Sequence, residues 1–279
     1  MITRIVLISL LTAGVAACGG ESDESGATTR VVAGFYPLAF AAEQIGGDGV
    51  DVTNLTPAGA EPHDLELTPR EVEEILDADL VLYLGEGFQP GVEEAAAESY
   101  GESIDALEGL QLREGDPHVW LDPVLFGRVV ERIGAQLGQE ASARQLVSRL
   151  NELDEAYQAG LADCEHRELV TTHDAFGYLA DRYGLEVVPI TGISPEAEPS
   201  PQDLQAVVDL VEASGVTTVF TETLLSPEVG ETVAREAGAT TAVLNPLEGL
   251  TEDEIAAGED YFSVMQTNLD ALRTGLRCR

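Results

Sequence analysis

Short β-branched runs alternate with helical segments along most of this chain, and that alternation limits the fold more than any other sequence feature. In the first half, strands are expected over Arg30–Phe35, Val50–Leu55 and Asp79–Leu84. A helix over Pro37–Ile45 separates the first two strands, and Thr68 has the features of an N-cap for the next helix. Strand, helix and strand in this order favour a parallel sheet with helices on both faces.

The alternation is interrupted once, by an almost continuous helical stretch from Val124 to Cys164 with a break near Gly138. Within it, Ser142–Ala162 carries apolar residues three or four positions apart, which is typical of one long amphipathic helix. The alternation then resumes, with strands expected over Glu168–Thr172, Glu186–Ile190, Val216–Thr221 and Thr240–Leu244, and helices over Ala175–Tyr183, Pro201–Ser214, Pro227–Ala237 and Asp260–Leu276. The sequence therefore predicts an α/β protein of two lobes, each a small parallel sheet flanked by helices. The lobes would span residues 30–137 and 165–279, joined by one long helix over 138–164.

The charge of the chain excludes one class of partner. Its 279 residues carry a formal net charge of −37, and all 14 basic residues are arginine. Such a surface repels phosphate backbones, so nucleic-acid binding is not expected.

The N-terminal residues indicate export and a lipid anchor. Residues 1–17 combine a short basic start with an apolar run too short to cross a bilayer, which is typical of a signal peptide. The run ends in small residues followed by Cys18, as in lipoprotein signals, and residues 18–29 have the composition of a flexible tether. We therefore expect a protein anchored through Cys18 on the extracellular face of the cell membrane.

The two remaining cysteines are Cys164 and Cys278. An even pair in an exported chain is more often a disulfide than a thiol site, so a bridge between them is expected. It would hold the C-terminus to the start of the second lobe.

The histidines are few and unevenly placed. Of the four, His63 and His118 lie in loops between elements and His173 directly follows an expected strand. Ligands of open α/β sheets bind outside the carboxyl ends of the strands, so these three could converge between the lobes. Neutral imidazoles suit zinc better than calcium or magnesium. His166, among charged neighbours, is expected to be exposed.

Four segments, in order along the chain, carry a family resemblance. They are Gly34-Phe35-Tyr36-Pro37-Leu38-Ala39, Ala58-Gly59-Ala60-Glu61-Pro62-His63, Asp116-Pro117-His118-Val119-Trp120-Leu121-Asp122-Pro123 and Thr171-Thr172-His173-Asp174-Ala175-Phe176-Gly177-Tyr178. Together they resemble the zinc/manganese solute-binding proteins of ABC importers, the ZnuA-like metal-binding lipoproteins. The resemblance covers about Val31 to Leu276.

This resemblance implies one metal ion held between two lobes and delivered to the permease of an ABC transporter, by a protein expected to act as a monomer. His63, His118 and His173 fall on the first three ligand positions of the family. Manganese-type members commonly have Glu at the third, so His173 favours zinc, with Mn²⁺ as the alternative. The fourth position is open. The family pattern points to Asn245, a poor zinc ligand, and water or Glu61, Glu222 or Glu248 are the other candidates.

The same residues bear on three alternative functions. Manganese or iron as cargo is disfavoured by three imidazoles without an assured carboxylate. A zinc hydrolase would also use three histidines, but the chain has no His-Glu-x-x-His helix and no glutamate marked as a general base, so an enzyme is not expected. A surface adhesin built on the same fold is compatible with metal binding.

Overall fold

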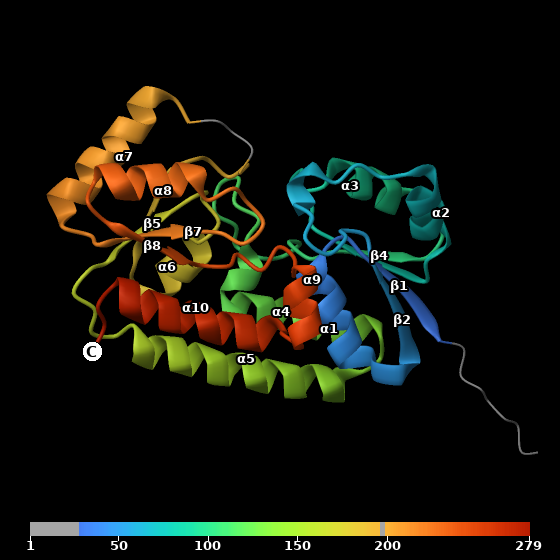
Figure 1. The fold of residues 1–279 in the computed structure, drawn as a ribbon. Helices are drawn as coiled ribbons and strands as arrows, with labels where there is room; N and C mark the ends of the chain where they lie inside the picture. Colours follow the sequence, from blue (N-terminus) through green and yellow to red (C-terminus); the bar gives the residue numbers. More distant parts are fainter. Residues whose placement is uncertain (1–27, 196–198) are drawn as a thin grey trace, which may run out of the picture.

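The computed structural model describes residues 28–195 and 199–279. The expected signal peptide, Cys18 and the tether up to residue 27 lie outside the described residues. Within the described residues, no helix is both long and apolar enough to cross a membrane. Figure 1 shows two lobes side by side above a layer of long helices.

The N-terminal lobe is built on a parallel sheet in the order β2-β1-β3-β4. Helices α2 and α3 cover one face, and α1 lies against the other (Figure 1). The helix α2 starts at a capping box, in which Thr68 and Glu71 bond each other's main-chain N–H groups. The bounds are β1 Thr29–Ala33, α1 Tyr36–Gly46, β2 Val50–Asn54, α2 Pro69–Asp77, β3 Leu80–Tyr83, α3 Pro90–Ala97 and β4 Glu102–Asp105.

The C-terminal lobe repeats this strand order with four parallel strands in the order β6-β5-β7-β8. Helices α7 and α8 cover one face of this sheet, while α6 and α10 lie toward the other (Figure 1). The bounds are β5 Glu168–Thr171, α6 Gly177–Tyr183, β6 Glu186–Pro189, α7 Pro201–Ser214, β7 Thr218–Thr221, α8 Glu228–Glu236, β8 Thr240–Val243, α9 Glu252–Ala257 and α10 Tyr261–Gly275.

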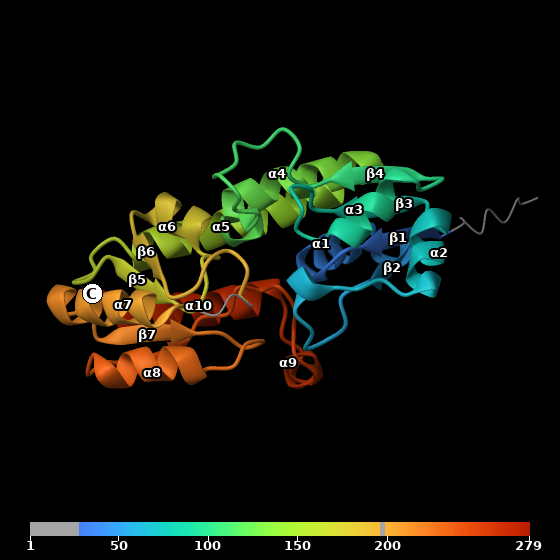
Figure 2. The same ribbon diagram turned by 90° about the horizontal axis from the view of Figure 1, so that it is seen from above.

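Two long helices join the lobes. Helix α4 (Pro123–Gln136) ends near Gly138, and α5 (Glu140–Gly160) then runs beneath both lobes, beside α1, α4 and α10 (Figures 1 and 2). The predicted two-lobe α/β fold is confirmed. The connection differs from the prediction in one respect, because α10 returns along α5 and adds a second helix beneath the C-terminal lobe.

The largest apolar core belongs to both lobes at once. It contains Phe35, Trp120 and Phe126 from the first half of the chain, together with Phe176 and Tyr261 from the second. The ring centroids of Phe35 and Trp120 are 4.7 Å apart, and those of Phe126 and Tyr261 are 4.9 Å apart. Burial of such large side chains is the main source of folding free energy, so the lobes are held together by packing as well as by their connections.

The C-terminus is fastened to the start of β5. Cys164 and Cys278 form a disulfide, and the N–H group of His166 donates to the carbonyl oxygen of Leu276. With the C-terminal segment bonded to its main chain, His166 is only 9% exposed. The expectation that His166 is exposed was wrong, because the charged residues beside it in sequence do not reveal the returning C-terminal segment.

Candidate metal centre

Three of the four histidines meet where the two sheets face each other. His63 lies in a short 3-10 helix, Pro62–Asp64, in the loop after β2, and His173 follows the end of β5. His118 immediately precedes the 3-10 turn Val119–Leu121, in the long segment between β4 and α4. Glu248 joins them from the loop between β8 and α9. The carboxyl ends of parallel strands are where α/β proteins place their ligands, and here both sheets contribute.

The four side chains form a metal-sized cluster. One ligand atom from each of His63, His118, His173 and Glu248 lies within 4.8 Å of the others. Oε1 of Glu248 is 3.1 Å from Nε2 of His63, 3.1 Å from Nε2 of His118 and 3.4 Å from Nε2 of His173. The side chains of His118, His173 and Glu248 are fully buried, whereas that of His63 is 10% exposed. Three nitrogen atoms and one carboxylate oxygen therefore face a single point from both lobes.

Two further carboxylates hold the buried imidazoles from behind. Oδ1 of Asp116 accepts the main-chain N–H of His118 at 3.0 Å and lies 2.8 Å from its Nδ1. Glu222 does the same for His173, with Oε1 accepting the main-chain N–H at 3.0 Å and Oε2 at 2.6 Å from Nδ1. A carboxylate at Nδ1 fixes the tautomer with the proton on that atom, which leaves the Nε2 lone pair for a metal.

The electrostatics of the cluster follow from its burial and its hydrogen bonds. Burial alone would lower the pKa of His173, but hydrogen bonds to Glu222 and Glu248 outweigh it and raise that pKa to about 10. The pKa of His118 is raised for the same reasons, with Asp116 in the place of Glu222. Burial opposes ionisation of Glu248, yet hydrogen bonds from the three histidines hold its pKa well below the usual value. The carboxylates thus draw positive charge to this point, and a divalent cation would supply it.

The four candidates for the fourth ligand position differ in where their side chains lie relative to the three histidines. Glu248 is the one that joins the cluster. Glu222 lies behind His173 as described. Glu61 lies near the cluster: its Oε1 accepts the main-chain N–H of His63, and burial followed by the charge of Glu248 raises its pKa to about 8.

The side-chain amide of Asn245, which the family pattern places at the fourth position, is hydrogen-bonded to other groups. Its Oδ1 accepts the N–H of Leu247 at 2.7 Å, and its Nδ2 donates to Glu254 at 3.0 Å. Leu247 adopts a left-handed conformation with φ of 56°. The amide thus organises the turn that precedes Glu248, and this local folding explains why the sequence alone could not choose between residues three positions apart.

The sequence interpretation missed the residues that support His118. Asp116 was part of a recognised motif, but no role was assigned to it. Its position two residues before a histidine and next to a proline is the signal that could have indicated one, because an Asp side chain readily bonds the main-chain N–H two residues on. Arg113, which contacts Asp116, lies in a loop without a recognisable motif.

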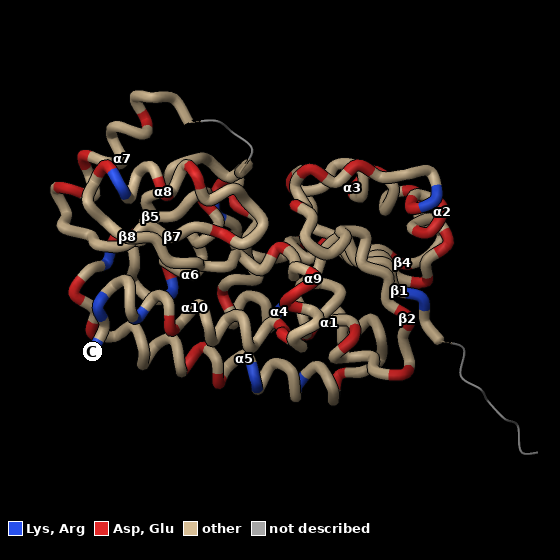
Figure 3. Tube along the Cα trace, in the orientation of Figure 1, with Lys and Arg blue, Asp and Glu red and all other residues tan. Residues whose placement is uncertain are grey.

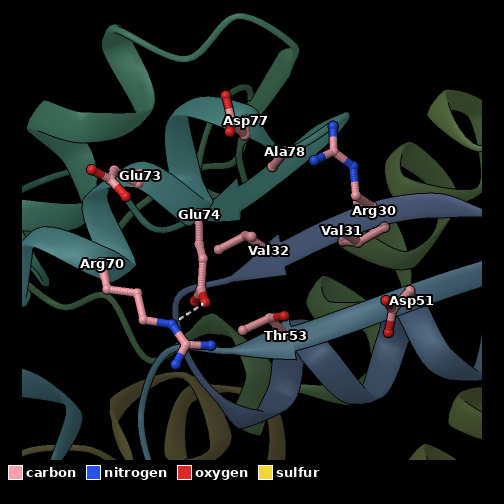
Figure 4. Close-up of a pocket in the computed structure, with 10 residues that line it drawn as sticks. All are labelled: Arg30, Val31, Val32, Asp51, Thr53, Arg70, Glu73, Glu74, Asp77 and Ala78. Atoms are coloured by element: carbon pink, nitrogen blue, oxygen red, sulfur yellow. Dashed lines mark hydrogen bonds and ion pairs between the residues drawn. The ribbon is translucent and has the colours of Figure 1, made fainter.

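A separate hollow lies on the outer face of the N-terminal lobe. It has a volume of about 350 Å³ between β1, β2 and α2, and Figure 4 shows Arg70 and Glu74 paired within it. None of its lining residues belongs to the metal-sized cluster. Its arginines and most of its carboxylates are exposed, and they are of mixed sign, so the hollow offers no set of convergent ligands.

The fold and the cluster together define a two-lobed solute-binding protein with one ligand set between its lobes. A model of the family described as zinc-uptake complex component A, periplasmic, matches residues 31–275. The high-affinity zinc uptake system protein ZnuA of Bacillus subtilis is 37% identical, over 94% of this chain and 93% of that protein. The zinc-binding lipoprotein AdcA of Streptococcus pneumoniae is 35% identical over 96% of this chain, which spans 60% of AdcA.

Solved structures show the same family relationship. The Zn(II)-bound ZnuA-like domain of Streptococcus pneumoniae AdcA superimposes with a TM-score of 0.78 at 36% identity, covering 90% of this chain and 99% of that domain. The laminin-binding protein Lmb of Streptococcus agalactiae superimposes with a TM-score of 0.83 at 30% identity, covering 90% of this chain and 100% of Lmb. Lmb is described as a bifunctional protein with adhesin and metal transporting activity. The chain therefore belongs to the zinc-uptake component A family. This is a family of metal carriers, which confirms the prediction that the chain is not an enzyme.

Proposed function

We propose that this protein captures one zinc ion between its lobes, with His63, His118, His173 and Glu248 as ligands, and delivers it to the permease of an ABC importer. The observation that carries the proposal is the convergence of four ligand atoms within 4.8 Å of one another. Three of the four residues are fully buried and each lobe contributes to the set.

The donor set favours zinc as cargo. Three imidazoles and one carboxylate suit a tetrahedral zinc ion, whereas Mn²⁺ and other hard cations depend on more anionic oxygen. A catalytic zinc site keeps one position open for water, whereas the four proposed ligands would fill a tetrahedral coordination shell. The zinc-binding names of the relatives and the zinc-bound neighbour support the same cargo.

Attachment and partners follow from the family and from the N-terminal sequence. We propose that Cys18 carries the lipid anchor on the extracellular face of the membrane, as the lipoprotein relative suggests, and that the protein acts as a monomer. Acidic residues are spread over both lobes and the helices beneath them (Figure 3). A carrier with that surface attracts divalent cations, an effect that salt screens.

The test begins with mature protein purified without added metal and analysed for bound metals. Competition titrations with Zn²⁺ and Mn²⁺ should then give a clear preference for zinc, and alanine at His63, His118 or His173, or glutamine at Glu248, should weaken zinc binding by orders of magnitude. His166→Gln is the control, because His166 lies outside the cluster. Near-normal zinc affinity in His118→Ala or His173→Ala, or a preference for Mn²⁺, would refute the assignment. A laminin-binding assay on the same preparation tests the adhesin alternative.

A further inference from the structure

We propose that Arg113 is a positioning residue for metal capture, which acts on His118 through Asp116 and ties that ligand to the opposite lobe. The inference rests on the proposed function, since it takes His118 to be a ligand. Its first observation is the contact between Nε of Arg113 and Oδ2 of Asp116, at 3.2 Å. Asp116 is only 4% exposed, and its other oxygen is the one that holds His118.

Arg113 supplies the counter-charge that a buried carboxylate needs. A carboxylate removed from water is stable as an anion only when it is paired or hydrogen-bonded. The Arg113 contact is an ion pair and not an aligned hydrogen bond, because neither Nε of Arg113 nor Oδ2 of Asp116 has a hydrogen-bond partner within residues 28–195 and 199–279. Its role is therefore to balance and orient Asp116. Among the described residues, the ion pairs of Glu222 and Glu248 are with histidines, whereas Asp116 also has an arginine.

The same arginine joins the segment before His118 to the C-terminal lobe. Its guanidinium pairs with Asp181 of α6, and its main-chain N–H donates to the hydroxyl of Tyr178 at 2.8 Å. That hydroxyl donates in turn to the carbonyl oxygen of Asp116 at 2.9 Å. The position of His118 is thus set by residues of the lobe that also carries His173.

A glycine on α6 provides independent evidence that this contact is built into the fold. A Cβ atom at Gly177 would lie 2.5 Å from Nε of Arg113 and 2.5 Å from Oδ2 of Asp116. Distances below 3.0 Å are not tolerated without movement, so any side chain at Gly177 would displace the pair. The close approach of α6 to Arg113 and Asp116 therefore requires glycine at this position.

The experiment compares Arg113→Gln with Arg132→Gln in the full mature protein. Both arginines are partly exposed, at 38% and 33%, and Arg132 pairs with Glu108 away from the cluster. Loss of a residue that supports a metal ligand typically costs about 10–100-fold in affinity, so Arg113→Gln should bind zinc roughly tenfold more weakly, and Arg132→Gln normally. Arg113→Lys should restore part of the loss, because one ammonium cannot span both Asp116 and Asp181.

Two further measurements separate positioning from simple structural support. With Co²⁺ as a spectroscopic probe, Arg113→Gln should shift the ligand-field absorption bands, which Arg132→Gln should leave unchanged. In an Asp116→Asn background, Arg113→Gln should have no further effect on zinc affinity, because the ion pair through which Arg113 acts on His118 is already lost. If Arg113→Gln does not fold, Gly177→Ala displaces the same pair and should reproduce the loss.

The outcomes also distinguish this inference from the proposed function. Zinc affinity and cobalt bands in Arg113→Gln equal to those of Arg132→Gln would overturn it, even if His118→Ala abolishes binding. An equal loss from Arg113→Gln with and without Asp116→Asn would overturn it as well, because the effect would not pass through Asp116. If His118→Ala binds zinc normally, the proposed function fails first and this inference with it.

Discussion

Trp120 donates its indole N–H to the carbonyl oxygen of Pro246 at 2.8 Å, a bond that crosses from one lobe to the other. Trp120 lies two residues after His118, with ring centroids 5.0 Å apart, and Pro246 lies two residues before Glu248. The two loops that carry these candidate ligands are therefore joined directly. Tyr261 adds a second bond, from its hydroxyl to the carbonyl oxygen of Trp120 at 2.7 Å.

We expect Trp120→Phe to loosen both loops while leaving the core largely filled. The substitution leaves a buried carbonyl oxygen without its donor, which costs about 1–3 kcal/mol of folding free energy. Zinc should dissociate several-fold faster, because the ligands on either side of the bond are less well fixed. Chemical unfolding and stopped-flow zinc release measure the two effects. An unchanged release rate in a destabilised variant would mean that the bond supports the fold alone.

Restoring the carboxylate of the family pattern at Asn245 should fail to improve metal binding. Nδ2 of Asn245 donates to Glu254 at 3.0 Å, so Asn245→Asp sets two carboxylates against each other and removes a buried donor. We expect a loss of about 1–3 kcal/mol in stability and no gain in Mn²⁺ affinity. Matched Zn²⁺ and Mn²⁺ titrations decide the matter. Tighter Mn²⁺ binding would place residue 245 at the metal after all.

The contrast between Asn245 and Glu248 shows how far the sequence could be used to predict the site. The three histidines were identified because the ends of parallel strands converge and because the motifs repeat a known family pattern. The choice of the fourth side chain depends on a left-handed residue, Leu247, and on the hydrogen bonds of one amide. Such local geometry has no periodic signal, so it could not be read from the residue order.

Most of the fold was predictable because its elements follow periodic sequence patterns, and the elements that were not predicted lack such a pattern for physical reasons. Alternating strand and helix patterns specify parallel sheets, and the Thr68 cap marked the start of α2 as expected. The short edge strand β4 and helix α3 were not predicted. The strand Glu102–Asp105 is only four residues long, partly exposed and polar, and its pairing with β3 comes from the sheet around it and not from its own propensity.

The disulfide between Cys164 and Cys278 should contribute to stability without affecting the metal. It joins positions 114 residues apart, and closing such a loop in the unfolded chain typically adds roughly 2–4 kcal/mol. Replacing both cysteines by alanine should therefore lower the melting temperature of the metal-free protein and leave zinc affinity within about twofold. Thiol counting on denatured protein from its native compartment should find no free thiol at these two positions. Two reactive thiols would show that the bridge does not form in the cell.

Zinc binding should release protons, with His173 as the main source. In the metal-free protein its pKa is raised from 6.5 to about 10, so at pH 8 its imidazole is charged, whereas a metal ligand must be neutral. The raised pKa also means that His173 stabilises the metal-free fold fully below about pH 6.5, and that this contribution is lost as pH rises through about 10. Zinc affinity should therefore increase with pH across this range, by up to tenfold per pH unit for each proton released.

Calorimetric titration at pH 8 in buffers of different ionisation enthalpy measures the number of protons directly. We expect about one from His173, with a further contribution from His118, whose pKa is also raised. Glu222→Gln removes the negative charge beside Nδ1 of His173, so it should lower the pKa of His173 and reduce the proton release at pH 8. His166→Gln serves as the control and should behave as wild type. Zinc binding without proton release at pH 8 would show that the imidazoles are already neutral before the metal arrives.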